Sequence, residues 1–322
     1  MALPPALIAL DIDGTLLPPD SRDLSERSRE AIAAAQAAGI EVAVATGRRH
    51  RYAAPILERA ALPAETILIS SNGSVTRTLA GERLHCSTLP PELACELSTA
   101  LERWGGAVVF TLDREGEGEL LVESLATLTE QVPRWVEANR ASIQEVRPLS
   151  AAFRSQSGER AAESKAQSSV QSPMQGPMQG PIQGMICGTE AAMQATEQWL
   201  RSSELASKME IVRTSYAERD LTILDLLPLG CSKGSALAQL AASRGLTAAQ
   251  VMAVGDNWND ESMLAWAGWP VVMGNAAPDM LQLARTRGWR IGPGNHEEGV
   301  AWAIAVALAA HRSHKLYSET DR

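Results

Sequence analysis

Residues 6–17 read ALIALDIDGTLL, an apolar run that stops at two aspartates, Asp11 and Asp13, with Gly14 directly after them. A short, uninterrupted apolar run is typical of a strand buried on both faces of a parallel sheet. Ligands bind beyond the carboxyl ends of such strands, so two carboxylates at this position favour a chemical role. Gly14 permits a tight turn after them. Taken alone, the DxD pattern is also compatible with two solvated acids in a turn, because short motifs match by chance.

The same pattern recurs along the chain. Residues 40–45 (IEVAVA), 66–69 (TILI) and 251–254 (VMAV) are further predicted buried strands. Each ends in a polar cluster, which is Thr46-Gly47-Arg48, SSNG at 70–73 and GDNWND at 255–260, respectively. Predicted helices at 25–38 and 51–61 separate the first three strands. Alternating strands and helices indicate a parallel α/β sheet, in which these polar groups share one edge.

Composition limits the class of protein. The 322 residues carry a formal charge of −9, which argues against nucleic acid or an anionic membrane surface as a partner. No apolar stretch reaches the roughly 18–20 residues of a membrane helix, and the N-terminal apolar run lacks the basic region of a signal peptide. The cysteines, Cys86, Cys95, Cys187 and Cys231, form no CxxC pair. We therefore expect free thiols in a reducing cytoplasm.

The alternation of predicted buried strands and helices ends at about residue 83. Short strand candidates and two helix candidates (91–104 and 189–201) predict a smaller α+β module at 85–224, inserted into a core of residues 1–84 and 225–322. Within the module, residues 155–184 contain the tetrapeptides PMQG, PMQG and PIQG after a Ser/Gln-rich run, and we expect a disordered surface insertion without a role in activity. Residues 299–310 predict a last packing helix, followed by a polar tail at 311–322.

Lys233 occupies an unusual position. Ser232 is a suitable cap for a helix that runs to Ser243, which places Lys233 in the first helical turn. A cation there opposes the helix dipole, at a cost of a few tenths up to about 1 kcal/mol. We therefore expect an anionic group close to the Lys233 ammonium.

These polar positions form one candidate site, which comprises Asp11, Asp13, Thr46, Arg48, Asn72, Asp256, Asn259 and Asp260, with Lys233 at the start of a helix. Several carboxylates converging on one centre require a cation, and oxygen ligands select a hard ion such as Mg²⁺. A lysine, a threonine and an asparagine supply the positive charge and the donors that bind a phosphoryl group.

The order of these motifs resembles the haloacid dehalogenase superfamily. DIDGTLL is similar to its first motif, Thr46 in VAVATGR to its second, Lys233 in CSKG to its third, and GDNWND at 255–260 to its fourth. SSNG at 70–73, GNA at 274–276 and NHEEGVA at 295–301 resemble further signatures of its Cof-like phosphatases, which carry a type IIB cap between the second and third motifs. The resemblance covers roughly residues 6–84 and 225–310. The low-complexity insert departs from the family.

The resemblance implies a catalytic and metal-binding set. Asp11 would attack phosphorus to form an aspartyl-phosphate. Asp13 would protonate the leaving oxygen and then deprotonate water. Mg²⁺ would be held by the Asp11 carboxylate, the Asp13 backbone carbonyl and Asp256. Asp260 would lie behind these ligands or orient Lys233.

The resemblance also implies a substrate-binding set. Thr46, Lys233 and Asn259 would bind the oxygens of the transferring phosphoryl group, with Gly47, Arg48 and Asn72 as further substrate contacts. A strand-end Arg48 or Asn72 is equally compatible with a turn or surface residue. The resemblance implies that the cap determines which substrate is bound. The expected substrates are small phosphorylated metabolites such as sugar phosphates, flavin mononucleotide and pyridoxal phosphate.

Other functions stay open at this level. A phospho-accepting receiver-like switch also uses strand-end acids, a Thr and a Lys around Mg²⁺, although it needs neither the DxD spacing nor a large insertion. A phosphomutase would pass the aspartyl-phosphate to a second hydroxyl. Sucrose-phosphate and mannosyl-phosphoglycerate phosphatases share the core and the cap type, but are expected to differ from SSNG after the third strand. The leading hypothesis is a Mg²⁺-dependent phosphatase of small phosphate monoesters.

Overall fold

The computed structural model describes residues 3–18, 21–102, 108–154 and 180–320. The chain divides into two compact units. The core unit comprises Met1–Ser87, Val212–Ser215 and Gly230–Arg322, and the cap unit comprises Thr88–Ile211 and Tyr216–Leu229. Across the described ranges, no helix is long and apolar enough to cross a membrane.

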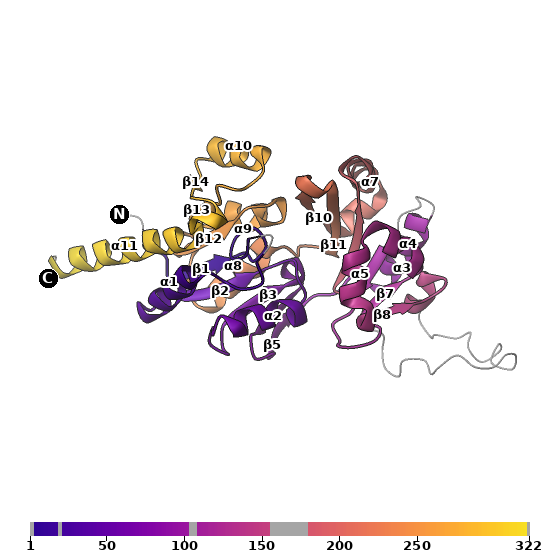
Figure 1. Cartoon of the computed structure of the whole chain (residues 1–322), viewed down its shortest axis with the longest axis horizontal. Helices are drawn as coiled ribbons and strands as arrows, with labels where there is room; N and C mark the ends of the chain where they lie inside the picture. The colour runs from indigo at the N-terminus through magenta and orange to yellow at the C-terminus, as the bar shows by residue number, and fades with distance from the viewer. Residues whose placement is uncertain (1–2, 19–20, 103–107, 155–179, 321–322) are drawn as a thin grey trace, which may run out of the picture. The chain divides into compact units, whose positions relative to one another are not determined.

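An eight-stranded sheet forms the centre of the core unit (Figure 1). The strands from β14 to β3 run parallel, and β4 and β5 extend one edge in antiparallel fashion. Strand β1, which precedes Asp11, therefore has a parallel neighbour on each side. In spatial order the strands are β14 (Arg290–Ile291), β13 (Trp269–Val272), β12 (Val251–Gly255), β1 (Leu7–Leu10), β2 (Glu41–Ala45), β3 (Ile67–Ser70), β4 (Val75–Thr78) and β5 (Arg83–Cys86).

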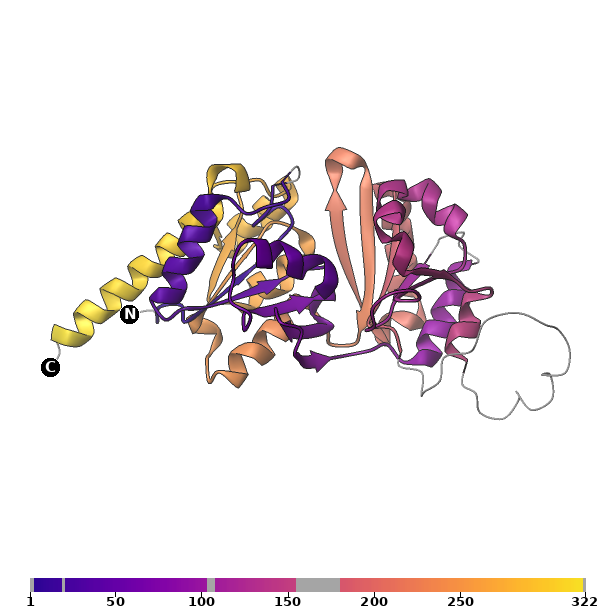
Figure 2. The same ribbon diagram turned by 60° about the horizontal axis from the view of Figure 1, so that its bottom comes forward.

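Helices cover both faces of this sheet. One face packs against α1 (Glu26–Ala37), α2 (His50–Arg59) and α11 (Gly299–Thr320), and the other against α8 (Lys233–Ser243), α9 (Glu261–Trp266) and α10 (Pro278–Arg287). Figures 1 and 2 show α1 and α11 side by side. Ile8 and Leu10 point to the first layer and Leu7 and Ala9 to the second, and none of the four is exposed. A strand covered on both faces is apolar throughout, as the run before Asp11 predicted.

Side-chain caps begin two of these helices where the sequence predicted them. The Ser25 hydroxyl accepts the Ser28 N–H at 3.0 Å at the start of α1. Ser232 and Ser235 exchange hydrogen bonds at the start of α8, with N–H to hydroxyl distances of 2.9 and 3.0 Å. Each bond satisfies a backbone N–H that lacks a partner inside the helix. The capping box makes Lys233 the first residue of α8.

The cap unit is an α+β structure. Its six-stranded sheet packs against α3 (Pro91–Glu102) and α7 (Glu190–Ser202) on one face, and against α4 (Leu125–Gln131) and α5 (Pro133–Asn139) on the other. This mixture of strands and helices is the α+β class that the change in sequence pattern near residue 83 predicted. The strand order is β10 (Met209–Tyr216), β11 (Leu221–Pro228), β9 (Gln183–Gly188), β6 (Val108–Thr111), β7 (Leu120–Val122) and β8 (Ile143–Glu145).

The structure corrects two sequence-based boundaries. The predicted insertion reached residue 184, but Gln183 and Gly184 belong to β9. A Cβ on Gly184 would lie 3.2 Å from a Phe110 ring carbon, so this glycine serves close packing rather than flexibility. The rest of that prediction, at 155–179, lies outside the described residues. The helix predicted at 299–310 was also too short, because α11 continues to Thr320 through the first ten residues of the polar tail and no helix breaker follows Ala310.

Candidate active site

The register of three parallel strands brings the site together. Leu10 of β1 pairs with Val254 of β12 on one side and with Val44 of β2 on the other. The residues that follow these positions therefore emerge at the same edge, and they are Asp11, Asp256 and Thr46. This convergence is the one that the strand-end pattern predicted.

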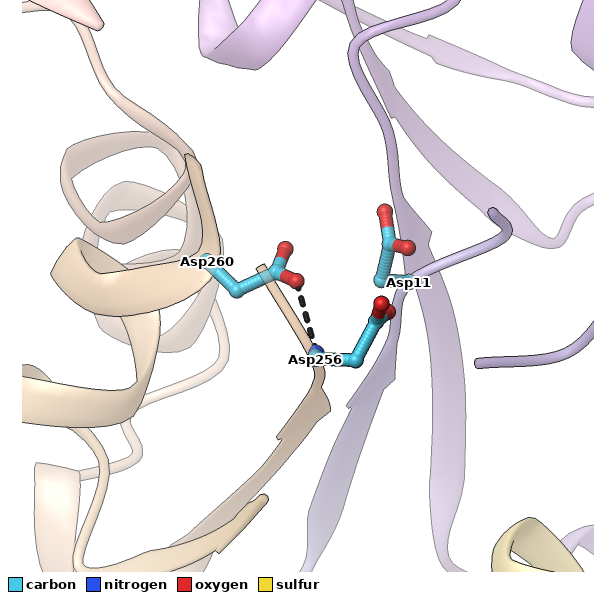
Figure 3. A group of neighbouring side chains, drawn as sticks. All are labelled: Asp11, Asp256 and Asp260. Atoms are coloured by element: carbon cyan, nitrogen blue, oxygen red, sulfur yellow. Dashed lines mark hydrogen bonds between the residues drawn. The ribbon is translucent and has the colours of Figure 1, made fainter. Parts of the chain in front are cut away.

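Asp11, Asp256 and Asp260 form a compact acidic cluster (Figure 3). Each offers one carboxylate oxygen, and these oxygens lie within 4.8 Å of one another. The Lys233 ammonium is buried beside them, with Nζ 2.6 Å from Asp11 Oδ1 and 2.6 Å from Asp260 Oδ1. Two carboxylates thus provide the anionic partner expected for a lysine in the first turn of α8.

The charges in this cluster do not balance. With every group ionised, three carboxylates face one ammonium, which leaves an excess of two negative charges. Burial and then the Asp260 charge raise the pKa of Asp11 from 3.8 to about 8. Burial and the charges of Asp11 and Asp260 likewise raise the pKa of Asp256 well above its ordinary value. Burial works against the charged Lys233, but Asp11 and Asp260 outweigh it and raise the pKa of Lys233.

A divalent cation fits this donor set. Oxygen ligands are those that Mg²⁺ prefers, and a double positive charge would cancel the excess. Asp11 and Asp256 are the better ligands, because Asp260 is already engaged at both oxygens. Asp260 Oδ1 accepts from Lys233, and its Oδ2 accepts the backbone N–H of Asp256 and Asn257 at 2.9 and 3.0 Å.

Two glycines let the loops approach these carboxylates. Gly14 has a φ of +83°, and a Cβ there would lie 2.7 Å from Asp256 Cγ. A Cβ on Gly255 would lie 2.6 Å from Asp260 Cβ. Any side chain at these positions would push the acidic groups apart, so both glycines are required by close packing, and Gly14 also by its positive φ.

Asp13 stands apart from the acidic cluster. Its carboxylate makes a two-point ion pair with the Arg48 guanidinium, in which Nε lies 2.7 Å from Oδ2 and Nη2 contacts Oδ1. Both side chains are about one-third exposed. Arg48, which the sequence suggested as a substrate contact or a turn or surface residue, therefore orients the second aspartate of the DxD pattern.

The remaining predicted residues adjoin one another. Asn259 Nδ2 donates to Asn72 Oδ1 at 3.2 Å, and a Cβ on Gly47 would lie 3.2 Å from the same Asn72 amide. Thr46 is fully buried, and its hydroxyl accepts the Arg48 N–H at 3.1 Å. Asn72 lies in η1 (Ser71–Gly73) with a φ of +52°, a conformation that asparagine tolerates better than most residues.

Sequence reasoning missed two residues of this region. The Thr15 hydroxyl donates to Asp256 Oδ1 at 2.8 Å, and Asn275 Nδ2 donates to the Gly14 carbonyl at 2.9 Å. Both belong to quoted motifs, DGT and GNA, but those motifs alone did not indicate a partner. Each contact joins loops more than 240 residues apart in the chain.

The fold and this site define a phosphatase core of the haloacid dehalogenase type. The family of haloacid dehalogenase-like hydrolases matches residues 8–304, and the chain belongs to it. It is a phosphatase of that family, a phosphoric monoester hydrolase, with the α/β core and inserted cap that the sequence predicted.

Individual relatives cover nearly the whole chain. Phosphatase YwpJ of Bacillus subtilis is 31% identical over 303 residues, which are 92% of this chain and 97% of that protein. An HMP-PP phosphatase of Serratia proteamaculans is 28% identical over 277 residues and 86% of each chain. Among solved structures, a haloacid dehalogenase-like hydrolase from Bacteroides thetaiotaomicron is 25% identical with a TM-score of 0.66, covering 93% of this chain and 98% of that one. The subclass IIB sugar phosphatase BT4131 is 20% identical with a TM-score of 0.68, covering 93% and 97%, and supports the fold.

Proposed function

We propose that this protein is a Mg²⁺-dependent phosphatase that hydrolyses small phosphate monoesters through a phosphorylated Asp11. The observation that carries the proposal is the buried cluster of Asp11, Asp256 and Asp260 around Lys233, in which full ionisation would leave an excess of two negative charges. A structural ion pair needs no such excess. A site for a divalent cation and a phosphoryl group does.

In the first step, a carboxylate oxygen of Asp11 forms a bond to phosphorus while the bond from phosphorus to the ester oxygen breaks. Asp13 donates a proton to that leaving oxygen. In the second step, water attacks the phosphorus, Asp13 takes the proton of that water, and the bond from Asp11 to phosphorus breaks. Two easier steps replace one difficult step.

The other residues hold the reacting groups. Lys233, Thr46 and Asn259 bind the phosphoryl oxygens, with Gly47 and Asn72 lining the same loops. Asp11, the Asp13 backbone carbonyl and Asp256 would hold Mg²⁺, which would supply positive charge against the phosphoryl oxygens. Asp260 orients Lys233, a role supported by the 2.6 Å contact between them. Arg48 holds Asp13 through their two-point ion pair.

The names of the relatives suggest the substrate class. Curated relatives include HMP-PP phosphatases, and a protein of the same fold is a sugar phosphatase. We therefore propose small phosphorylated metabolites, with HMP-PP and sugar phosphates first among them. We also place the enzyme in the cytoplasm, which the scattered cysteines, spaced without a CxxC pair, support.

The test is phosphate release from a panel of small phosphate esters, with Mg²⁺ and with EDTA. We expect release that requires the metal and falls by more than about 1000-fold in Asp11→Asn, since removing a nucleophile eliminates the covalent route. Asp23→Asn is the matched control, because Asp23 forms an exposed ion pair with Arg59 at 2.7 Å in the same unit. Equal release in EDTA, or an active Asp11→Asn variant, would contradict the proposal. Stable incorporation of phosphate without its release would point to a phospho-accepting switch.

A further inference from the structure

Asn275 connects three loops at the carboxyl edge of the core sheet. It follows β13, and its side-chain amide donates from Nδ2 to the Gly14 carbonyl at 2.9 Å. The amide oxygen of Asn275 accepts the backbone N–H of Asn295 at 2.8 Å. Gly14 follows β1 and Asn295 begins η8 (Asn295–Glu297) after β14, so one side chain spans from β14 to β1 past the end of β12. Both ends of the amide are used, although the residue is exposed.

Gly14 links the side chain of Asn275 to the candidate catalytic residues. It directly follows Asp13, and its N–H donates to the Leu17 carbonyl at 2.9 Å, which closes the turn after β1. On its other side, Gly14 lies against the Asp256 carboxylate, where no side chain would fit. A carbonyl held by Asn275 therefore fixes the Gly14–Thr15 peptide, which begins one residue after Asp13 and lies beside the acidic cluster. Movement of that carbonyl would change the distance from Asp13 to Asp11.

We infer that Asn275 is a positioning residue that holds Asp13 at the geometry for proton transfer to the leaving oxygen. The inference rests on the proposed role of Asp13 as general acid. Arg48 orients the Asp13 carboxylate from the side chain, and Asn275 holds the adjoining backbone. A residue with this task affects the step in which the leaving oxygen takes a proton more than it affects substrate binding.

A purely structural role has a different signature. An exposed side-chain hydrogen bond contributes little to folding stability, and any general loosening of the loop would slow all substrates by the same factor. The distinguishing quantity is the ratio of kcat for an ester with a good leaving group to kcat for an ester with a poor one. Good leaving groups need little protonation, so loss of acid positioning raises this ratio.

The variant Asn275→Asp keeps the size of the side chain and the acceptor for the Asn295 N–H, but replaces the donor to Gly14 by an oxygen. Asn275→Ala removes the side-chain contacts without adding charge. Asn139→Asp is the control, because the Asn139 amide also donates to a backbone carbonyl, that of Trp135 at 2.7 Å, in the cap unit. Thermal unfolding checks that each variant is folded.

The experiment measures kcat and KM for p-nitrophenyl phosphate and for the best alkyl phosphate of the substrate panel. We expect both Asn275 variants to raise the kcat ratio about 10-fold, with KM nearly unchanged, since small misplacements of a catalytic group cost up to about 100-fold. Asn139→Asp leaves the ratio unchanged. In an Asp13→Asn background, which raises the ratio by itself, changing Asn275 has less than about a 2-fold further effect, because the two residues act on one step.

The outcomes distinguish a wrong inference about Asn275 from a wrong assignment of Asp13 as the general acid. If Asp13→Asn raises the ratio and the Asn275 variants do not, the inference about Asn275 is wrong and the role of Asp13 stands. If Asp13→Asn itself leaves the ratio unchanged, the proposed acid role fails and the inference fails with it. Additive effects of the two changes would also overturn the inference, because Asn275 would then act independently of Asp13.

Discussion

Replacing Lys233 by methionine tests the charge arrangement of the site without measuring activity. The side chain of Lys233 is fully buried, and those of Asp11 and Asp260 are 5% and 0% exposed. Methionine has similar length but no charge, so Lys233→Met leaves both carboxylates facing an apolar group. Removing one partner from a buried ion pair destabilises a protein by about 3–5 kcal/mol. Two charge-assisted hydrogen bonds, at about 1.5–3 kcal/mol each, give an overlapping range of about 3–6 kcal/mol.

The loss of folding stability in Lys233→Met depends on pH, and the protonation of Asp11 sets the direction of this dependence. In metal-free protein the pKa of Asp11 is raised from 3.8 to about 8. A carboxyl with a raised pKa binds its proton more tightly in the folded state, so the free energy of unfolding falls as pH rises from about 4 towards 8. Below pH 8 Asp11 is protonated with or without Lys233. Above pH 8 the wild-type protein releases that proton and the variant retains it, so the difference in stability between them widens.

Urea unfolding in EDTA at pH 6 and pH 9 measures this difference. We expect about 3–5 kcal/mol at pH 9 and a smaller value at pH 6. Adding Asp260→Asn to Lys233→Met recovers part of the loss, because it removes a buried carboxylate that has lost its ammonium partner. Lys208→Met is the control, since the Lys208 to Glu96 ion pair at 2.7 Å is exposed and such pairs contribute up to about 1 kcal/mol. A loss below about 1 kcal/mol at pH 9, or one that shrinks as pH rises, would refute the charge argument.

Two further predictions concern the backbone. Gly73→Ala destabilises the protein by more than about 2 kcal/mol in thermal unfolding, because φ is +104° and the new Cβ would lie 2.5 Å from the Ser232 carbonyl carbon. Gly81→Ala, with φ of +95° and open space around the new Cβ, loses only the backbone term of about 1–2 kcal/mol; equal losses for the two would show that the close contact is unimportant. Replacing residues 155–179 by a short Gly/Ser linker leaves phosphatase activity largely intact, whereas extending the deletion to 155–184 destabilises the cap unit by removing the start of β9; activity and circular dichroism of both deletions check this, and equal behaviour would contradict it.

The core fold was predictable because its signal is local. Each buried parallel strand is a short apolar run, and each run ends in a polar cluster at the same edge. Ser25 and Ser232 predicted where α1 and α8 begin, because the hydrogen bonds of a helix cap involve only residues close in sequence. Where the signal is weak, prediction failed. Strands β4 (VTRT) and β5 (RLHC) lack an apolar run; β5 is the edge strand of the sheet, and β4 lies between it and β3.

The candidate site was predictable to the level of residue types, but not to the level of pairing. A lysine opposing the helix dipole required an anion, and the structure provides Asp11 and Asp260. The ion pair of Arg48 with Asp13 and the contact of Asn275 with Gly14 could not be anticipated. Both contacts depend on how loops after different strands pack against one another. The spacing of residues along the chain does not predict this packing.

The position of β1 in the sheet also bears on how the protein is made. Strand β1 lies between β2, which ends at Ala45, and β12, which begins at Val251. At about 5–20 residues per second, a ribosome needs roughly 10–40 s for the roughly 200 residues between them. During that time β1 has one bare edge with Asp11 beside it, a surface prone to pairing with other chains. The chain of the cap unit, by contrast, is complete at Leu229. The cap unit is therefore the first unit whose folding can finish, whereas the core sheet lacks β12 until the second half of the core unit has been made.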